Sequence, residues 1–268
     1  MGPRVSVSLL VTLTILGFVG AFVAGLLGVG GAILMIPLLL YVPVWLGFPP
    51  LEVKAIAAIS MVQVFFAALS GAIAHGRRGA VHRRLTITVG VMAALGSLAG
   101  GVVSGWLHSL TLLSIFAAMA SLGAVLMWLA PLGKDEESSA ADSLTFHRPL
   151  AILVGGGVGL GAGLVGAGGA FLLVPLLITV VRIPTRITIG SSLAITLWTA
   201  TAGVLGKLAT GQIPFAPAAA LVVGAVPGAQ VGEWVSRRFG VRGLRSLLAA
   251  MTTLVALRVW ADVFSHFR

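Results

Sequence analysis

The sequence predicts an all-α polytopic membrane protein of two homologous halves in inverted topology, each with a Gly-interrupted hairpin and three transmembrane helices, about 8–10 membrane helices altogether. Composition, an internal repeat and the charge of the loops predict it. Of 268 residues, 58% are hydrophobic and 9% charged, with a mean hydropathy of +1.11. Soluble domains carry about 25% charged residues. Several apolar runs here reach the length of about 20 residues that spans a bilayer.

A Gly-rich motif occurs twice, and a Pro-Leu-Leu sequence follows each copy at the same distance. Residues 25–32 read GLLGVGGA and residues 163–170 read GLVGAGGA, with the prolines at Pro37 and Pro175. These copies are 138 residues apart, and beyond the next loop the offset becomes 132. At that offset the pairs include Lys54 with Arg186, Ser60 with Ser192, Gly79 with Gly211, Gly96 with Gly228 and Gly100 with Gly232. Matches in register over this length indicate a duplication.

The repeat divides the chain into a first membrane half, residues 1–130, and a second, residues 149–268. The polar linker between them, 131–148, contains the charge-dense sequence KDEESS. Each half is predicted to begin with the Gly-interrupted stretch, 5–46 or 149–181. Three single spans follow in each half, at 54–74, 85–104 and 110–130, and at 186–206, 214–235 and 244–262.

Loop charges predict opposite orientations for the two halves. Residues 75–84 contain four arginines, whereas the equivalent loop of the second half contributes only Lys207. The next loop reverses this, with no Lys or Arg in 104–111 and four in 236–245. By the positive-inside rule, equivalent loops lie on opposite sides, which places the linker in the cytoplasm and both termini outside it. Inversion requires the Gly-interrupted stretch to enter and return, as two half-helices or as two full spans.

The Gly-rich motifs are candidate substrate sites. Backbone outside regular helices is tolerated at membrane depth only beside protein or a water-filled cavity. A helix that begins at Ala32 or Ala170 would direct free N–H groups and its positive dipole end towards an anion. The alternative is that the glycines only permit close helix packing. The predicted binding glycines are Gly28, Gly30, Gly31, Gly166, Gly168 and Gly169.

Uncharged donors near the start of the following helices complete the predicted site. They are Ser60, Gln63, Ser191, Ser192 and Thr196, which donate hydrogen bonds without adding charge. The alternative is that these side chains bond to their own helix or to a neighbouring one. The equivalent cations Lys54 and Arg186 are interpreted as headgroup anchors, and the GxxxG pairs that begin at Gly96 and Gly228 as packing sites.

Other functions find little support in the sequence. None of the seven acids is predicted at the centre of a span, so a carboxylate proton relay is not expected; Glu233 is interpreted as a surface ion-pair residue beside Arg237. No cysteine is present, and the histidines lack metal-ligand spacing. We therefore predict no enzyme activity, metal or cofactor. The cations lie mostly in loops, which indicates topology signals rather than nucleic-acid binding.

The duplicated Gly-rich motif, the serine in the next helix and the loop glycines Gly79 and Gly211 resemble those of the sulfite exporter TauE/SafE family of bacterial membrane permeases. The resemblance covers nearly the whole chain. It implies an inner-membrane protein that moves sulfite, a sulfonate or a related small oxyanion. It also implies roles for the Gly-Gly segments, for both prolines and for Ser60 and Ser192. The second half reads Ser191-Ser192 where the first reads Ile59-Ser60, so two equal anion subsites are not implied.

The predicted function is thus secondary transport of a small anion by alternating access between the halves. A passive anion channel lined by the same residues is one alternative. A membrane scaffold or assembly factor without transport activity is another. Membrane lipid and the anion are the expected partners, and the sequence leaves the oligomeric state open.

Overall fold

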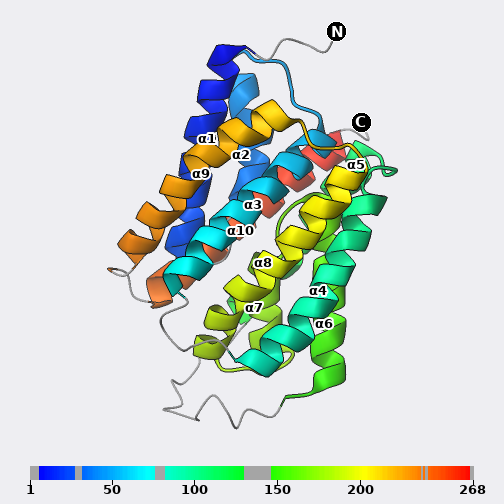
Figure 1. Ribbon diagram of the computed structural model, residues 1–268, viewed down its shortest axis with the longest axis vertical. Coiled ribbons are helices and arrows are strands. Elements are labelled where there is room, and N and C mark those ends of the chain that lie inside the picture. Colours follow the sequence, from blue (N-terminus) through cyan, green and yellow to red (C-terminus); the bar gives the residue numbers. More distant parts are fainter. Residues whose placement is uncertain are drawn as a thin grey trace.

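The computed structural model describes residues 6–27, 32–75, 82–129, 146–236, 238 and 241–265, and this part of the chain is helical with no strand (Figure 1). The helices are α1 (Val7–Leu27), α2 (Ala32–Trp45), α3 (Val53–His75), α4 (Arg83–Val103), α5 (Ser109–Leu129), α6 (Arg148–Val165), α7 (Ala170–Thr179), α8 (Thr185–Ala209), α9 (Phe215–Ser236) and α10 (Val241–Ser265). All but α2 and α7 are long and apolar enough to cross a membrane. The predicted all-α membrane fold is confirmed at this level.

Both Gly-interrupted stretches consist of one long and one short helix. The 21-residue α1 precedes the 14-residue α2, and the 18-residue α6 precedes the 10-residue α7. At 1.5 Å per residue α2 is about 21 Å long and α7 about 15 Å, against a hydrocarbon core of about 30 Å. The sequence left open two half-helices or two full spans; the described helices are one long and one short in each half, and the path of each stretch through the membrane stays a prediction. The helix α7 begins at Ala170, where the sequence suggested a helix start; residues 28–31, which precede α2, lie outside the described part of the chain.

The first helix of each half packs against the fourth helix of the other half, α1 on α9 and α6 on α4. A Cβ atom at Gly228 of α9 would overlap the carbonyl oxygen of Phe18, and one at Gly96 of α4 would overlap that of Gly156. These two contacts join residues that are equivalent at the offsets of 138 and 132. Because the helix backbones touch at these points, the predicted packing role of the GxxxG pairs is confirmed.

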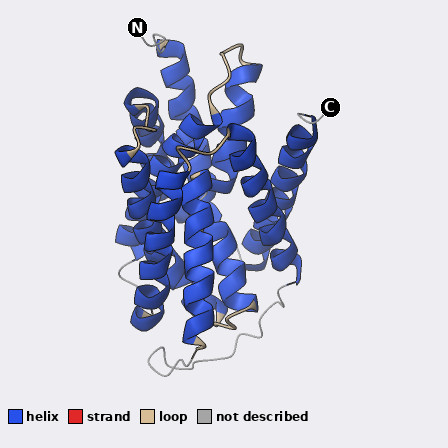
Figure 2. Cartoon of the chain, turned by 90° about the vertical axis from the view of Figure 1, so that its right-hand side faces the viewer, coloured by secondary structure: helices blue, strands red, loops and turns tan. Residues whose placement is uncertain are grey.

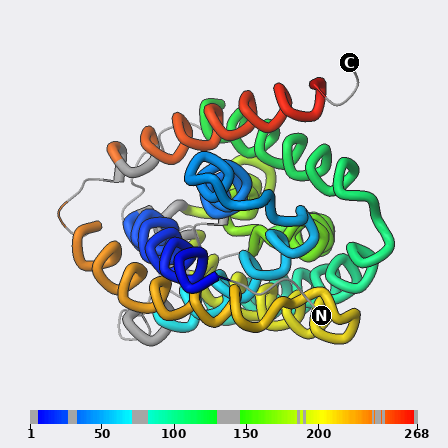
Figure 3. Tube along the Cα trace, turned by 90° about the horizontal axis from the view of Figure 1, so that it is seen from above, coloured from blue at the N-terminus to red at the C-terminus, as the bar shows by residue number. Residues whose placement is uncertain are grey.

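Two reciprocal hydrogen bonds join α5 to α10. Trp128 Nε1 donates to Thr253 Oγ1 at 3.2 Å, and Trp260 Nε1 donates to Ser121 Oγ at 3.0 Å. As the residue number rises along α5 it falls along α10, so the two helices are antiparallel. Figure 3 shows them side by side along one edge of the bundle, with α2 between α10 and α1.

The bundle has two distinct ends. Figures 1 and 2 show both chain termini, and so the start of α1 and the finish of α10, at the upper end, and in Figure 1 α5 finishes and α6 begins at the lower end. The predicted linker lies mostly in residues 130–145, which are outside the described part of the chain. The helices therefore place the start of the first half and the finish of the second half at one end.

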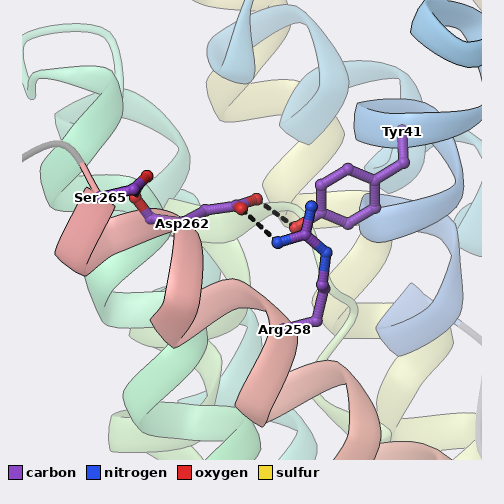
Figure 4. Close-up of polar contacts among 4 residues, drawn as sticks. All are labelled: Tyr41, Arg258, Asp262 and Ser265. Carbon is purple, nitrogen blue, oxygen red and sulfur yellow. Dashed lines mark hydrogen bonds and ion pairs between the residues drawn. The ribbon is translucent and has the colours of Figure 1, made fainter.

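A polar cluster fastens α2 to α10 near the upper end (Figure 4). Tyr41 donates a hydrogen bond from its hydroxyl to Asp262 Oδ2, and Arg258 Nη1 lies 2.6 Å from Asp262 Oδ1. The Arg258 guanidinium also lies 4.6 Å from the centre of the Tyr41 ring. One tyrosine thus contacts both members of an ion pair on the other half of the protein.

Tyr41→Phe is expected to lower the unfolding free energy by about 1–2 kcal/mol, because a partly buried carboxylate loses its hydroxyl donor. Thermal unfolding in detergent would measure this. Ser265→Ala is the matched control, since Ser265 is exposed and, among the described residues, its hydroxyl donates to the backbone carbonyl of Asp262 alone; it should change the free energy by less than about 0.5 kcal/mol. Equal effects of the two substitutions would contradict the assignment.

Candidate functional site

The turn between α6 and α7 is built from glycines in the left-handed region. Gly166, Gly168 and Gly169 have φ values of 76°, 62° and 76°. Gly166 ends α6 and donates its N–H to the carbonyl of Ala162 at 2.8 Å, while Gly169 is the N-cap of α7. Glycine adopts these angles at little steric cost, whereas other residues do not. These glycines therefore join α6 to α7 through a turn of four residues, 166–169.

This turn packs closely on α3 of the other half. A Cβ atom at Gly166 would overlap the carbonyl oxygen of Ala57, and one at Gly168 would overlap a methyl group of Val64. Val64 stands at the middle of α3. Ser60 lies between Ala57 and Val64 on the same helical face, because residues three and four apart are neighbours on a helix. The Gly-rich turn therefore covers the face of α3 that carries Ser60.

The start of α7 provides backbone donors inside the protein. The N–H groups of Ala170 and Phe171 have no partner within the helix, because the first turn of any helix lacks acceptors. Both residues are buried, and the cap residue Gly169 has no side chain to accept their hydrogen bonds. A buried helix start of this kind combines donors that have no acceptor within their own helix with a positive dipole end, which favours an anion.

Three predicted side chains add further unused hydrogen-bonding groups. Ser60 Oγ, both polar atoms of Gln63 and Thr196 Oγ1 are buried and have no hydrogen-bond partner in the described part of the chain. Ser60 and Gln63 share a face of α3, which packs against α8, where Thr196 lies. Leaving one such group unsatisfied costs about 1–3 kcal/mol. Native proteins satisfy nearly all of their buried polar groups, so these atoms are candidate contacts for a polar ligand.

Of the other predicted site residues, Ser192 is fully buried in α8 at the position equivalent to Ser60. Ser191 has a structural contact, because its Oγ accepts the backbone N–H of His82 at 3.1 Å, just before α4 begins. Gly28, Gly30 and Gly31 lie outside the described residues. The structure thus describes the Gly-rich turn of the second half alone.

Sequence reasoning missed two polar residues near this site. Ser97 of α4 is fully buried, its hydroxyl is unpaired within the described residues, and it lies close to Gly203 of α8 and Met61 of α3. The only sequence signal was a serine in an apolar run. Lys207 was interpreted as a loop residue, but α8 continues to Ala209 and buries it completely. The apolar run fades before the helix does, because a lysine lowers hydropathy but favours helix.

The described acids lie at helix ends. Glu52 immediately precedes α3, while Glu233 and Asp262 lie in the last turns of α9 and α10. Glu233 is 7% exposed, so its interpretation as a surface residue was wrong; its predicted partner Arg237 lies outside the described residues. The error arose because α9 packs tightly on α1: the backbone nitrogen of Glu233 is among the atoms nearest to a Cβ built at Gly25. Among the described residues no three His, Cys, Asp or Glu side chains gather as a metal site would require.

Comparison with known proteins identifies the family of the chain. The family model described as sulfite exporter TauE/SafE matches residues 13–259. A probable membrane transporter protein of Xylella fastidiosa (strain 9a5c) is 31% identical over 96% of this chain and 98% of its own length. The probable membrane transporter protein YunE of Bacillus subtilis is 23% identical over 95% and 99% of the two chains. No solved structure matches the chain. The family match covers most of the sequence, and the chain belongs to the sulfite exporter TauE/SafE family of membrane transporters.

Proposed function

We propose that the protein is a secondary transporter of a small oxyanion, namely sulfite, a related sulfur oxyanion or an organosulfonate. The observation that carries this proposal is the buried group of unused, uncharged donors on α3 and α8, beside the buried start of α7. The oxygens of a deprotonated oxyanion accept hydrogen bonds, so such donors suit it. A cation site would need acidic or carbonyl ligands, and the described acids lie at helix ends.

Alternating access follows from the arrangement of the halves, which we propose to be inverted repeats. Two facts support this: α1–α9 and α6–α4 share equivalent contacts, and the equivalent helices α5 and α10 are antiparallel. A two-fold axis in the membrane plane would bring α3 and α8 together near the midplane. The anion would bind there while the halves rock about it.

In this proposal the protein lies in a bacterial inner membrane with both termini outside the cytoplasm and the linker inside. Because the chain has no cysteine, single-cysteine labelling tests it. Glu52 and Pro184 are exposed, equivalent positions just before α3 and α8. Glu52→Cys should react with an impermeant maleimide in intact spheroplasts, and Pro184→Cys only after permeabilisation. Reaction of both from the same side would exclude inverted repeats.

Uptake into proteoliposomes tests transport itself. Radiolabelled sulfite, thiosulfate and a small sulfonate should enter with saturable kinetics, and an imposed ion gradient should change the rate. Flux that rises linearly with concentration would favour the passive channel. Folded protein that moves none of these anions would favour the scaffold and would exclude the proposed substrates.

A further inference from the structure

Lys207 is a completely buried cation near the end of α8 that the transport site described above does not use. Its Nζ donates to Ser104 Oγ at 2.9 Å and to the carbonyl oxygen of Leu164 at 3.4 Å. An ammonium group has three donors, and these two contacts are the hydrogen bonds it makes within the described part of the chain. Lys207 pairs with no carboxylate there. Burying a cation without a counter-charge is unfavourable unless another partner compensates.

The position of Lys207 connects the upper end of the bundle with the Gly-rich turn. Above it, Gln212 is half-buried, accepts from Ser104 at 3.0 Å and donates to the Gly101 carbonyl at 3.0 Å. Below it, the Leu164 carbonyl belongs to the last turn of α6, two residues before Gly166. On one side, Ser104 links Lys207 to Gln212, a side chain that reaches the surface. On the other side, Lys207 contacts Leu164, which lies two residues before the turn that covers Ser60.

We propose that Lys207 binds the transported oxyanion as it passes between the Gln212 end and the Gly-rich turn. The ammonium group then exchanges its bonds to Ser104 and Leu164 for bonds to the anion, which supplies the missing negative charge. This inference rests on the proposed oxyanion transport. It assigns a second, charged subsite in addition to the uncharged one on α3 and α8.

A purely structural lysine is the competing explanation, because cations stabilise carbonyl groups at helix C-termini. Lys54 provides a matched comparison at the same end. Its Nζ donates to the Gly105 carbonyl at 2.9 Å, one residue from Ser104, but the side chain is only half-buried. The ammonium group of Lys54 can reach water, so Lys54 fits the headgroup anchor predicted from the sequence.

The experiment compares Lys207→Met, Lys207→Arg and Lys54→Met in proteoliposomes, with radiolabelled sulfite as the probe. Lys207→Met should raise the KM for sulfite about tenfold or more, because a charge-assisted hydrogen bond to the anion is lost. Lys207→Arg should restore the KM to within about threefold of wild type, and Lys54→Met should leave it unchanged. Sulfite-induced thermal stabilisation of the purified protein should decrease in Lys207→Met alone.

The outcomes separate this inference from the function on which it rests. If wild type neither transports nor is stabilised by any oxyanion tested, the proposed function fails, and the subsite with it. If wild type transports sulfite and Lys207→Met keeps its KM and thermal shift, the subsite alone is excluded. Should Lys207→Met fail to fold, Ser104→Ala decides: it frees the ammonium while keeping its charge, so sulfite affinity should hold or improve, and a loss would overturn the inference.

Discussion

Gly166→Ala should destabilise the protein by about 2–5 kcal/mol, because the added methyl group carries two separate costs. The first is the left-handed backbone, with φ at 76°, which costs a residue with a Cβ about 1–2 kcal/mol. The second is steric, because the new Cβ would overlap the Ala57 carbonyl oxygen, and overpacking costs about 1–3 kcal/mol. The overlap is with backbone atoms of α3, which cannot move aside as the end of a flexible side chain could. Thermal unfolding and the monodisperse yield in detergent would measure the loss.

Gly211→Ala separates these two costs. Gly211 has a similar φ of 66°, but a Cβ there would meet nothing within 4 Å. Its substitution should therefore show the conformational cost alone, about 1–2 kcal/mol. If Gly166→Ala were no worse than Gly211→Ala, the Gly-rich turn would not be packed on α3. The proposed cover over Ser60 would then be wrong.

The sequence predicted those parts of the fold that depend on local chemistry. Apolar runs, glycines and prolines located the six single spans, α3–α5 and α8–α10, to within a few residues, and the start of α7 at Ala170. Hydropathy and helix breaking act over one or two turns, so a single sequence carries them. The length of α7 could not be predicted from the sequence, since no local signal in an apolar run distinguishes a short helix from one that spans the membrane.

The site was predicted less completely because burial is a property of packing. Ser60 and Ser191 have the same hydroxyl, yet the first has no partner in the described residues and the second accepts from the backbone before α4. Ser97 and Lys207 are buried by helices that are distant from them in the sequence, and their contacts lie on those helices. The repeat could identify Ser60, since a repeat pairs positions, but Ser97 is equivalent to Ala229 and had no such signal.

Thr196→Val should reduce sulfite uptake about tenfold without destabilising the protein. The hydroxyl of Thr196 is buried and unpaired in the described residues, so an isosteric methyl group removes an unsatisfied polar atom, and the unfolding free energy should hold or rise by about 1 kcal/mol. The bound anion, in contrast, loses a donor worth about 1.5–3 kcal/mol in a buried site. Transport and stability would change in opposite directions, as at sites built for function.

Thr199→Val is the control, one turn further along the same helix. Thr199 is equally buried, but its Oγ1 donates to the Ile195 carbonyl of its own helix at 2.8 Å. Its loss should leave uptake within about twofold of wild type, since such bonds serve the helix itself. Equal losses of uptake in both variants would mean that a valine at either position of α8 impairs transport. The proposal that the Thr196 hydroxyl binds the anion would then be wrong.

A double substitution, Ser60→Ala with Thr196→Val, tests whether the two halves hold the same anion. Ser60 lies on α3 of the first half and Thr196 on α8 of the second. If both hydroxyls bind one sulfite ion, loss of the first donor lets the anion shift, and the second loss then costs less than it does alone. The coupling energy should be about 0.5–3 kcal/mol. If the effects of the two substitutions on the free energy derived from KM simply add, the two hydroxyls bind at separate sites. That result would contradict an anion held between the halves, because such an anion must contact both hydroxyls.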